Sequence, residues 1–456
     1  MVRLFSIYLP VRTLVLMLGE ALIFVGSFVL AAAIQWGPES AAILNGPNFA
    51  KILAISAMAV VCAYYLDLYD PRQLNCGSEA YSRMLIVLAL LAFLLAAIGY
   101  FFPSFLMGRR VFVVALIILT ISLLSWRAAY AWLVRKPYLR ERVYVLGAGD
   151  RARTLIEAIR ERPDVPMEII GWAGALGNGS FTRETLGEAV EALHTKGKVD
   201  RVIVALNDRR GTLPVRELLE LRLRGVRVED AASVLEKMSG KIEVDALHPS
   251  ALIFSEGFRL HTGLLVARRL ISVLMSLTGL LLVLPLIPFV VLAIKLTSDG
   301  PVLFRQERVG RYGETFTLFK FRTMRQDAES GTGPVWAADN DPRITPVGRF
   351  LRKSRLDEIP QLWNVLKGDM GFVGPRPERP EFVQWLTEAI PYYHLRHMIR
   401  PGVTGWAQVQ YQYGASLEQS KQKLQYDLYY IKHMSLMLDL VILFKTVKTV
   451  ITARGL

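Results

Sequence analysis

Two adjacent carboxylates, Asp357 and Glu358, lie at the centre of the stretch of the chain that is best equipped for chemistry. Three cations precede them closely: Arg352, Lys353 and Arg355. Pro360 follows after one intervening residue, and Arg376 lies further along the chain, between two prolines. Carboxylates can hold a divalent cation or attack phosphorus, and arginines can grip phosphate oxygens with paired N–H groups. The pattern therefore favours chemistry on a phosphate, with a solvated, salt-bridged helix start as the alternative.

The proline also predicts the local backbone. Neighbouring residues of an α-helix point about 100° apart, so Asp357 and Glu358 would diverge inside a helix. Proline is favoured in the first helical turn. We therefore expect the two carboxylates at or before the start of a helix that begins near Pro360.

The composition indicates a basic membrane protein. Of the 456 residues, 52% are hydrophobic, and the net charge is +14. Such an excess suits anionic lipid headgroups or anionic substrates on the cytoplasmic side of a membrane. We do not expect a nucleic-acid partner, because the sequence has neither zinc-ligand spacing nor an aromatic-basic recognition signature. The two cysteines are too few for a disulfide framework, and no cleavable signal is expected.

Four apolar segments open the chain, each near the length that spans a bilayer: residues 14–35, 52–69, 84–106 and 111–134. Arg3 and Arg12 precede the first segment, whereas residues 36–50 contain no Lys or Arg, and further cations follow residue 134. This asymmetry places the N-terminus and the chain after residue 135 in the cytoplasm, although Arg109 and Arg110 go against it. We predict a four-helix transmembrane domain over residues 1–136.

Residues 137–262 are predicted to form a small doubly wound, Rossmann-like domain. Buried strands over residues 143–149, 167–173, 201–205 and 226–229 alternate with helical stretches. Gly147-x-Gly149-x-x-Ala152 matches the dinucleotide fingerprint, but no acidic residue closes the second strand, where a ribose hydroxyl would be held. The motif is either a nucleotide site or a tight turn that packs a helix on a strand, and we assign no cofactor to it.

A fifth apolar segment, residues 268–296, contains Pro285 and Pro288. A proline inside a helix removes a backbone hydrogen bond, so two of them predict a sharp bend. A simple span would place the strongly basic residues that follow outside the cytoplasm, whereas a re-entrant helix keeps them inside. We expect the re-entrant form, with a mostly α-helical catalytic domain over residues 263–456.

Short extended pieces follow this segment. Alternation places Lys320 and Arg322 on one face of a strand, with Phe319 and Phe321 on the other. The two cations are candidates for phosphate binding. A solvated strand face, or contact with lipid phosphate, is the alternative.

The chain from Arg268 onward resembles the bacterial sugar transferase family, the monotopic phosphoglycosyl transferases that begin polysaccharide assembly on polyprenyl phosphate. The resemblance is carried by several blocks in order: Gly300-Pro-Val-Leu-Phe-Arg-Gln, Lys320-Phe-Arg-Thr-Met, Leu356-Asp-Glu-Ile-Pro-Gln-Leu-Trp-Asn-Val-Leu-Lys-Gly-Asp-Met and Val373-Gly-Pro-Arg-Pro. The N-terminal helices and the middle domain are similar to those of the long, exopolysaccharide-type members. The family often has Ser-Pro at the helix break, whereas this chain has Leu284-Pro285, which leaves open how the break is satisfied.

The resemblance implies transfer of a sugar-1-phosphate from a UDP-sugar to undecaprenyl phosphate, with release of UMP and a covalent aspartyl-phosphosugar intermediate. It implies that Asp357 is the nucleophile and that Glu358 helps it to hold Mg²⁺. Lys320, Arg352 and Arg376 correspond to the family's phosphate-contacting and Pro-Arg-Pro positions. It also implies a homodimer in the bacterial inner membrane, with the catalytic domain on the cytoplasmic face.

Two other functions are alternatives for a chain with these segments. A membrane-anchored nucleotide-sugar dehydratase would need a Tyr-x-x-x-Lys pair, and we find none. A catalytically dead scaffold would have lost the acid pair or its arginines, and these are present. The sequence does not identify the sugar or a ligand for the middle domain.

Overall fold

The computed structural model describes residues 2–4, 7–37, 46–69, 78–103, 108–134, 136, 139–162, 164–173, 190, 199–206, 212–245, 247, 249–254, 257–326, 328, 341–411 and 416–451. Contacts divide the chain into two compact units, Met1–Val2 with Tyr8–Met238 and Arg3–Ile7 with Ser239–Leu456. Residues 239–262, which the sequence analysis grouped with the middle domain, therefore cluster with the C-terminal unit. For example, Trp406 Nε1 donates to the Gly240 carbonyl at 2.8 Å. The three predicted domain boundaries stay a prediction.

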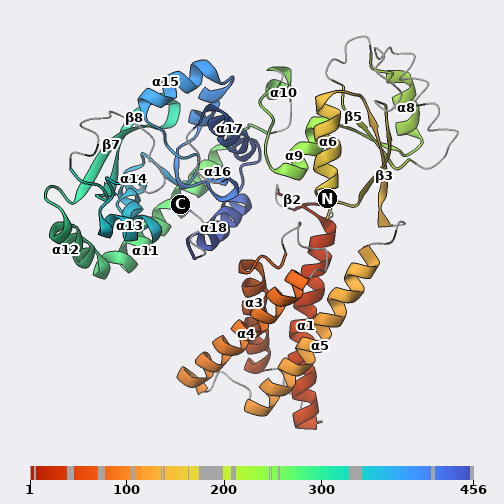
Figure 1. Cartoon of the computed structure of the whole chain (residues 1–456), viewed down its shortest axis with the longest axis horizontal. Coiled ribbons are helices and arrows are strands. Elements are labelled where there is room, and N and C mark those ends of the chain that lie inside the picture. Colours follow the sequence, from red (N-terminus) through yellow and green to blue (C-terminus); the bar gives the residue numbers. More distant parts are fainter. Residues whose placement is uncertain are drawn as a thin grey trace. The chain divides into compact units, whose positions relative to one another are not determined.

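The four apolar segments at the N-terminus are helices, as their composition predicts (Figure 1). They are α1 (Val11–Trp36), α3 (Pro47–Tyr65), α4 (Ser78–Phe101) and α5 (Arg109–Val134), and two short strands, β1 (Val2–Leu4) and β2 (Ile7–Leu9), precede them. All four helices are long and apolar enough to cross a membrane. Large apolar side chains such as Leu22 and Phe93 remain exposed on their outer faces, as a lipid environment requires.

A buried polar cluster lies among these helices. Arg127 Nε on α5 donates to Glu20 Oε1 on α1 at 2.7 Å, and the Tyr69 hydroxyl donates to Glu20 Oε2 at 2.6 Å. The Arg127 guanidinium also reaches the Leu68 carbonyl at 3.3 Å. Charged side chains in a membrane segment are tolerated when they pair with one another, and this cluster therefore fixes how α1 and α5 pack.

The second part of this unit is a parallel sheet with helices on both faces (Figure 1). The strands β3 (Glu141–Leu146), β4 (Met167–Trp172), β5 (Arg201–Val204) and β6 (Arg227–Asp230) pair in the order β4-β3-β5-β6. One core holds α6 (Asp150–Arg160) and α9 (Ala231–Ser239) against one face, and a second core holds α8 (Val215–Leu223) against the other. A Cβ on Gly147 would lie 2.5 Å from the Ala205 carbonyl oxygen. The glycine motif therefore lets two strand ends approach closely, and whether it also binds a nucleotide stays open.

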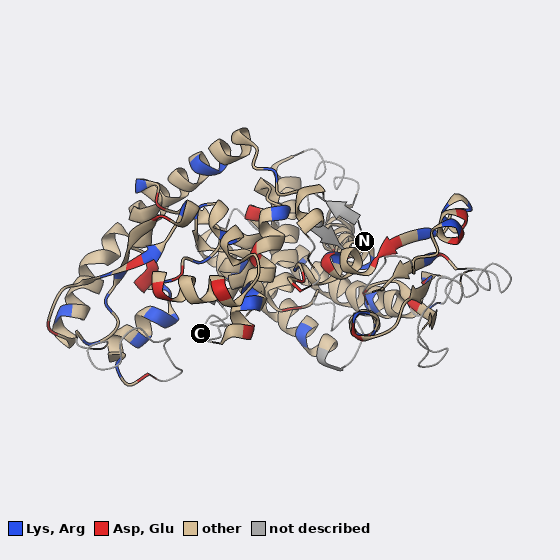
Figure 2. Ribbon diagram, turned by 90° about the horizontal axis from the view of Figure 1, so that it is seen from above, with Lys and Arg blue, Asp and Glu red and all other residues tan. Residues whose placement is uncertain are grey.

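The C-terminal unit combines an antiparallel hairpin, a two-stranded parallel pair and many short helices. Its strands are β7 (Leu303–Val309), β8 (Thr315–Phe321), β9 (Gly371–Val373) and β10 (Gly402–Thr404). Its helices after the hairpin are α13 (Pro346–Lys353), η8 (Leu356–Glu358), α14 (Gln361–Lys367), α15 (Pro380–Ala389), η9 (Tyr393–Met398), α16 (Trp406–Gln410), α17 (Leu417–Lys432) and α18 (Leu436–Ile451). Basic and acidic residues are interspersed along the ribbon (Figure 2).

The fifth apolar segment is broken at the two prolines. Helix α11 (Thr262–Val283) passes through the 3₁₀ turn η6 (Leu284–Leu286) into α12 (Ile287–Thr297), and α10 (Pro249–Phe254) precedes it. Pro288 occupies the first turn of α12, where its missing N–H costs no hydrogen bond. The Leu284 N–H reaches the Leu280 carbonyl and the Ile287 N–H reaches the Leu284 carbonyl. A serine at the break would bond a carbonyl that the prolines leave free. Here backbone N–H groups of the 3₁₀ turn satisfy some of these carbonyls instead.

Both ends of this segment are fastened to the same unit. At the start of α11, Arg268 pairs with Asp439 at 2.7 Å and donates to the Val373 carbonyl at 2.8 Å. After α12, the Ser298 and Asp299 carbonyls each accept from Arg322 at 2.6 Å. The leucines between these two anchor points are largely exposed.

Candidate active site

The two carboxylates lie on the 3₁₀ turn η8, between α13 and α14. Arg355, which precedes the turn, has a φ of 58°, in the left-handed region that few residues other than glycine adopt. Its carbonyl accepts from the Glu358 N–H at 3.2 Å. Pro360 is the N-cap of α14. Asp357 and Glu358 therefore stand immediately before a helix, as the proline predicted.

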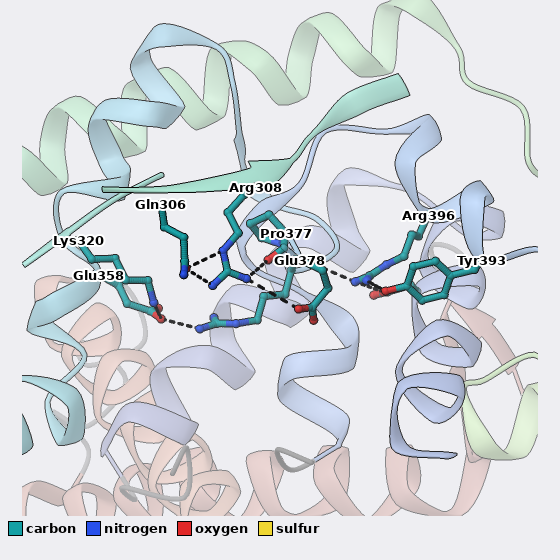
Figure 3. Close-up of polar contacts among 10 residues, drawn as sticks. Gln306, Arg308, Lys320, Glu358, Pro377, Glu378, Tyr393 and Arg396 are labelled. Carbon is teal, nitrogen blue, oxygen red and sulfur yellow. Dashed lines mark hydrogen bonds and ion pairs between the residues drawn. The ribbon is translucent and has the colours of Figure 1, made fainter. Parts of the chain in front are cut away.

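Glu358 is surrounded by cations. Its Oε1 accepts hydrogen bonds from Lys320 Nζ at 3.1 Å and from Arg376 at 3.0 Å, and it forms an ion pair with Arg355 at 3.6 Å. Figure 3 shows the Lys320 and Glu358 side chains meeting. Burial acts to raise the pKa of Glu358, but Lys320, Arg376 and Arg355 outweigh it and hold that pKa well below its usual range. Glu358 is therefore a carboxylate at any physiological pH.

Asp357 has a different environment. Its side chain is buried, and Oδ1 has no hydrogen-bond partner in the described part of the chain. Burial raises the pKa of Asp357. The charge of Lys320 acts to lower this pKa, and the charge of Glu358 acts to raise it. A buried carboxylate oxygen without a partner is costly, and such atoms are found where a ligand or a reaction uses them. Asp357 is thus a candidate for a nucleophile or a metal ligand.

Lys320 is the side chain that approaches Glu358 from the hairpin. It lies near the end of β8, and burial lowers its pKa in spite of Glu358. Arg376 and Arg308 lower that pKa further, because they add positive charge to the same small volume. The site therefore holds more positive charge than its carboxylates balance.

The remaining predicted cations fall in two places. Arg352 lies in the last turn of α13, where its Nε donates to Thr323 Oγ1 at 2.9 Å, and its charge lowers the pKa of Asp357. Arg322, one residue beyond the end of β8, has other partners. Its two terminal nitrogens bond the Ser298 and Asp299 carbonyls, so its contact with a phosphate stays a prediction that these bonds do not support.

Asn364 on α14 is a residue whose role was not predicted. It is fully buried, its Oδ1 accepts from the Phe319 N–H at 3.1 Å, and its Nδ2 donates to the Thr317 carbonyl at 2.7 Å. It therefore attaches β8 to the helix that follows Glu358 and sets the distance between Lys320 and the carboxylates. A buried asparagine has no signature in sequence, because its partners are backbone atoms 45 and 47 positions away.

The site has the ligand types for a magnesium ion. No group of three or more His, Cys, Asp or Glu residues converges anywhere in the described residues. Mg²⁺, however, is commonly held by one or two carboxylates together with substrate phosphates and water. Asp357 Oδ1 is unpartnered, and the three cations around Glu358 all meet Oε1. The donor set of Asp357 and Glu358 fits the ion on these grounds.

Comparison with known proteins identifies the family. The family model described as bacterial sugar transferase matches residues 264–453. The UDP-glucose:undecaprenyl-phosphate glucose-1-phosphate transferase of Escherichia coli (strain K12) is 33% identical over 334 residues, which cover 70% of each chain. The chain belongs to the bacterial sugar transferase family.

Other relatives support the same conclusion. A UDP-N-acetylgalactosamine-undecaprenyl-phosphate N-acetylgalactosaminephosphotransferase of Aeromonas hydrophila is 40% identical over 241 residues, 53% of this chain and 56% of the relative. The exopolysaccharide production protein PSS of Rhizobium leguminosarum is 41% identical over 196 residues, 42% of this chain and 98% of the relative. The predictions of the family and of an enzyme of the phosphoglycosyl transferase class are confirmed by these matches.

Proposed function

We propose that this family member transfers a sugar-1-phosphate from a UDP-sugar to undecaprenyl phosphate, with Asp357 as the nucleophile. The observation that carries the proposal is the buried, unpartnered Oδ1 of Asp357 beside a carboxylate that three cations hold ionised. The relatives that are named for a UDP-sugar and undecaprenyl phosphate support the donor and the acceptor. Those names differ in the sugar, so the donor sugar is left to experiment.

The reaction proceeds in two displacements. In the first, the Asp357 carboxylate attacks the phosphorus that carries the sugar, and the bond from this phosphorus to the bridging oxygen breaks, so that UMP leaves with the electron pair. In the second, a phosphate oxygen of undecaprenyl phosphate attacks the same phosphorus, and the bond to Asp357 breaks. A covalent intermediate of this kind splits a transfer between a soluble and a lipid substrate into two steps at one site.

The surrounding cations make the first attack feasible. A diphosphate brings about two negative charges that repel a carboxylate, and fixed positive charges must offset them before attack. Lys320, Arg352 and Arg376 supply this charge in the proposal. Mg²⁺, when held by Asp357 and Glu358, would withdraw charge from the phosphate oxygens.

The broken helix is proposed to enter the membrane and return to the same side. With a rise of 1.5 Å per residue, the 22 residues of α11 are about 33 Å long and the 11 residues of α12 about 16 Å. A bilayer core is about 30 Å thick, so α11 is long enough to cross it alone and α12 is not, and the whole run Thr262–Thr297 is also apolar enough to span. What supports the re-entrant form is that the residues at both ends bond to the unit that carries Asp357. The many cations that follow the segment favour the cytoplasm for this side of the membrane. The expected homodimer stays a prediction.

A labelling experiment tests this topology. In a variant without the native cysteines, Val266→Cys and Leu296→Cys place a thiol near each end of the broken helix, at side chains that are exposed. We expect a membrane-impermeant maleimide to label both from the cytoplasmic side only. Labelling of the two thiols from opposite sides would mean that the helix spans the membrane.

The nucleophile is tested by transfer of label. Wild type and Asp357→Asn are incubated in detergent with radiolabelled UDP-glucose, UDP-galactose or N-acetylated donors and with undecaprenyl phosphate. Asp245→Asn is the matched control, because Asp245 is exposed and pairs only at the surface with Lys421. We expect wild type and the control to transfer label and Asp357→Asn to lose transfer. Full activity of Asp357→Asn would exclude this nucleophile, and no transfer by wild type from any donor would exclude the function.

A further inference from the structure

The Pro375-Arg376-Pro377-Glu378 segment is fixed along its whole length. Each of its four carbonyl oxygens accepts a hydrogen bond: Pro375 from the Gly402 N–H at 2.9 Å, Arg376 from the Arg396 guanidinium at 2.9 Å, Pro377 from the Arg308 guanidinium at 3.0 Å, and Glu378 from the Val309 N–H at 2.9 Å. The two prolines also lock φ on both sides of Arg376. A backbone held in this way leaves Arg376 only its side-chain torsions.

Arg396 is itself held by buried partners. Its exposed fraction is 4%, its NH1 donates to the Tyr393 hydroxyl at 2.6 Å, and its NH2 lies 2.9 Å from Asp427 Oδ2 on α17. Burial acts to lower the pKa of Arg396, but Tyr393 and Asp427 outweigh it, so the guanidinium is charged. Figure 3 shows Arg396 and Tyr393 on one side of the Pro377 turn. The buried, charged Arg396 side chain therefore donates to the carbonyl of Arg376, the residue whose own side chain bonds Glu358.

Arg308 holds the turn from the other side. Its Nε donates to Gln306 Oε1 at 3.0 Å, and NH1 lies 3.8 Å from a Glu378 carboxylate oxygen in addition to its bond with the Pro377 carbonyl. Figure 3 shows Arg308 between Gln306 on the hairpin and Pro377 and Glu378 on the turn. The bonds of both arginines described here go to backbone carbonyls and to side chains outside η8.

We propose that Arg396, with its counterion Asp427, and Arg308 are positioning residues that aim the Arg376 side chain at Glu358. The inference rests on the proposed function, because it assigns these residues to the charge balance of that reaction. Neither arginine would contact the reacting phosphate. Each acts through Arg376, whose terminal nitrogen lies 3.0 Å from Glu358 Oε1. Replacing a residue that orients a metal ligand typically changes activity by about ten- to a hundredfold, and we expect an effect of the same size for residues that orient Arg376.

A double-mutant cycle tests this action. If Arg396 works only through Arg376, then Arg396→Met lowers kcat/KM by about ten- to a hundredfold in wild type and has no further effect in the Arg376→Ala background. Arg308→Lys keeps the positive charge beside Lys320 but cannot reproduce the paired bonds of the guanidinium to Gln306 and the Pro377 carbonyl. At a less buried site, it provides a second and independent cycle. Arg343→Met is the control, because the described bonds of Arg343 likewise join a carboxylate and a backbone carbonyl, those of Asp341 and Ala328, which lie outside the turn. Its effect should be the same in both backgrounds.

The outcomes are distinct. Loss of the Arg396 and Arg308 effects in the Arg376→Ala background supports the inference, provided that the control remains multiplicative. Equal effects in both backgrounds, or no effect of either arginine in wild type, would overturn it while the wild-type activity and the Asp357→Asn result leave the proposed function standing. A wild type that transfers no label overturns both. If Arg396→Met fails to fold, the Arg308 cycle decides.

Discussion

Replacement of Lys320 by methionine should separate activity from stability. Lys320 Nζ lies 3.1 Å from Glu358 Oε1. At an effective dielectric constant of about 20, two unit charges at that distance attract each other by about 5 kcal/mol. Two arginines still face Glu358 after the change, at 3.0 and 3.6 Å. Glu358 should therefore stay ionised in Lys320→Met.

The sign of the Lys320 pKa shift determines the effect on stability. Burial, together with Arg376 and Arg308, lowers that pKa in spite of the attraction to Glu358. The folded protein thus disfavours the charged lysine relative to water, and methionine removes a charge that the fold opposes. We expect the unfolding temperature in detergent to be unchanged or slightly raised. Activity should nevertheless fall, because loss of one fixed charge from a transition state typically costs about a hundred- to a thousandfold in rate.

The assay compares kcat/KM for label transfer with thermal unfolding in the same detergent. Lys367→Met is the matched control, because Lys367 is exposed and its pair with Asp369 at 3.3 Å lies at the surface. We expect that control to retain activity and stability. A Lys320→Met protein that keeps more than about a tenth of the activity would refute the electrostatic role. A Lys320→Met protein that loses activity and unfolds at a much lower temperature would refute the inference that the fold disfavours a charged Lys320.

Three further changes test the supports of the site. Asn364→Ala deprives β8 of two hydrogen bonds and should destabilise the fold by about 1–3 kcal/mol, seen as a lower unfolding temperature. Gly348→Ala puts a Cβ 2.0 Å from the Thr323 carbonyl oxygen and should cost about as much, whereas Gly263→Ala, in open space, should not. Burial lowers the pKa of His397 from 6.5 to about 3. Between these two values the unfolded chain binds more protons than the folded one, so the free energy of unfolding should fall by about 1.4 kcal/mol for each pH unit below about 6.5. His397→Asn should flatten this slope.

The sequence was sufficient where a signal is local. Apolar runs of bilayer length predicted the N-terminal helices, and Pro360 predicted that the carboxylates stand before a helix. Strand alternation grouped Lys320 with Arg322, but the two cations have different partners: Lys320 meets Glu358, whereas Arg322 bonds the Ser298 and Asp299 carbonyls. A pattern with a period of two residues predicts the face on which a side chain lies, but it does not predict the group that the side chain contacts.

Other features could not be read from the sequence because they depend on distant pairing. Glu20 and Arg127 form an ion pair across 107 positions, and neither has a partner signature nearby. Arg308 and Arg396 bind backbone carbonyls 69 and 20 positions away. Every residue carries a carbonyl, so such a bond leaves no trace in residue type. The Pro-Arg-Pro motif identified Arg376, but the side chains that hold its backbone became visible only in the folded chain.

The charge balance of the site connects these observations with the proposed substrate. Four cations influence the two carboxylates of η8: Lys320, Arg352, Arg355 and Arg376. Positive charge therefore exceeds negative charge, and this excess contributes to the lowered pKa of Lys320. A diphosphate with about two negative charges would restore the balance and raise that pKa, since opposite charges favour the protonated lysine. The excess of positive charge that disfavours a charged Lys320 in the protein alone thus favours binding of an anionic donor. For this reason, replacement of Lys320 should lower activity without lowering stability.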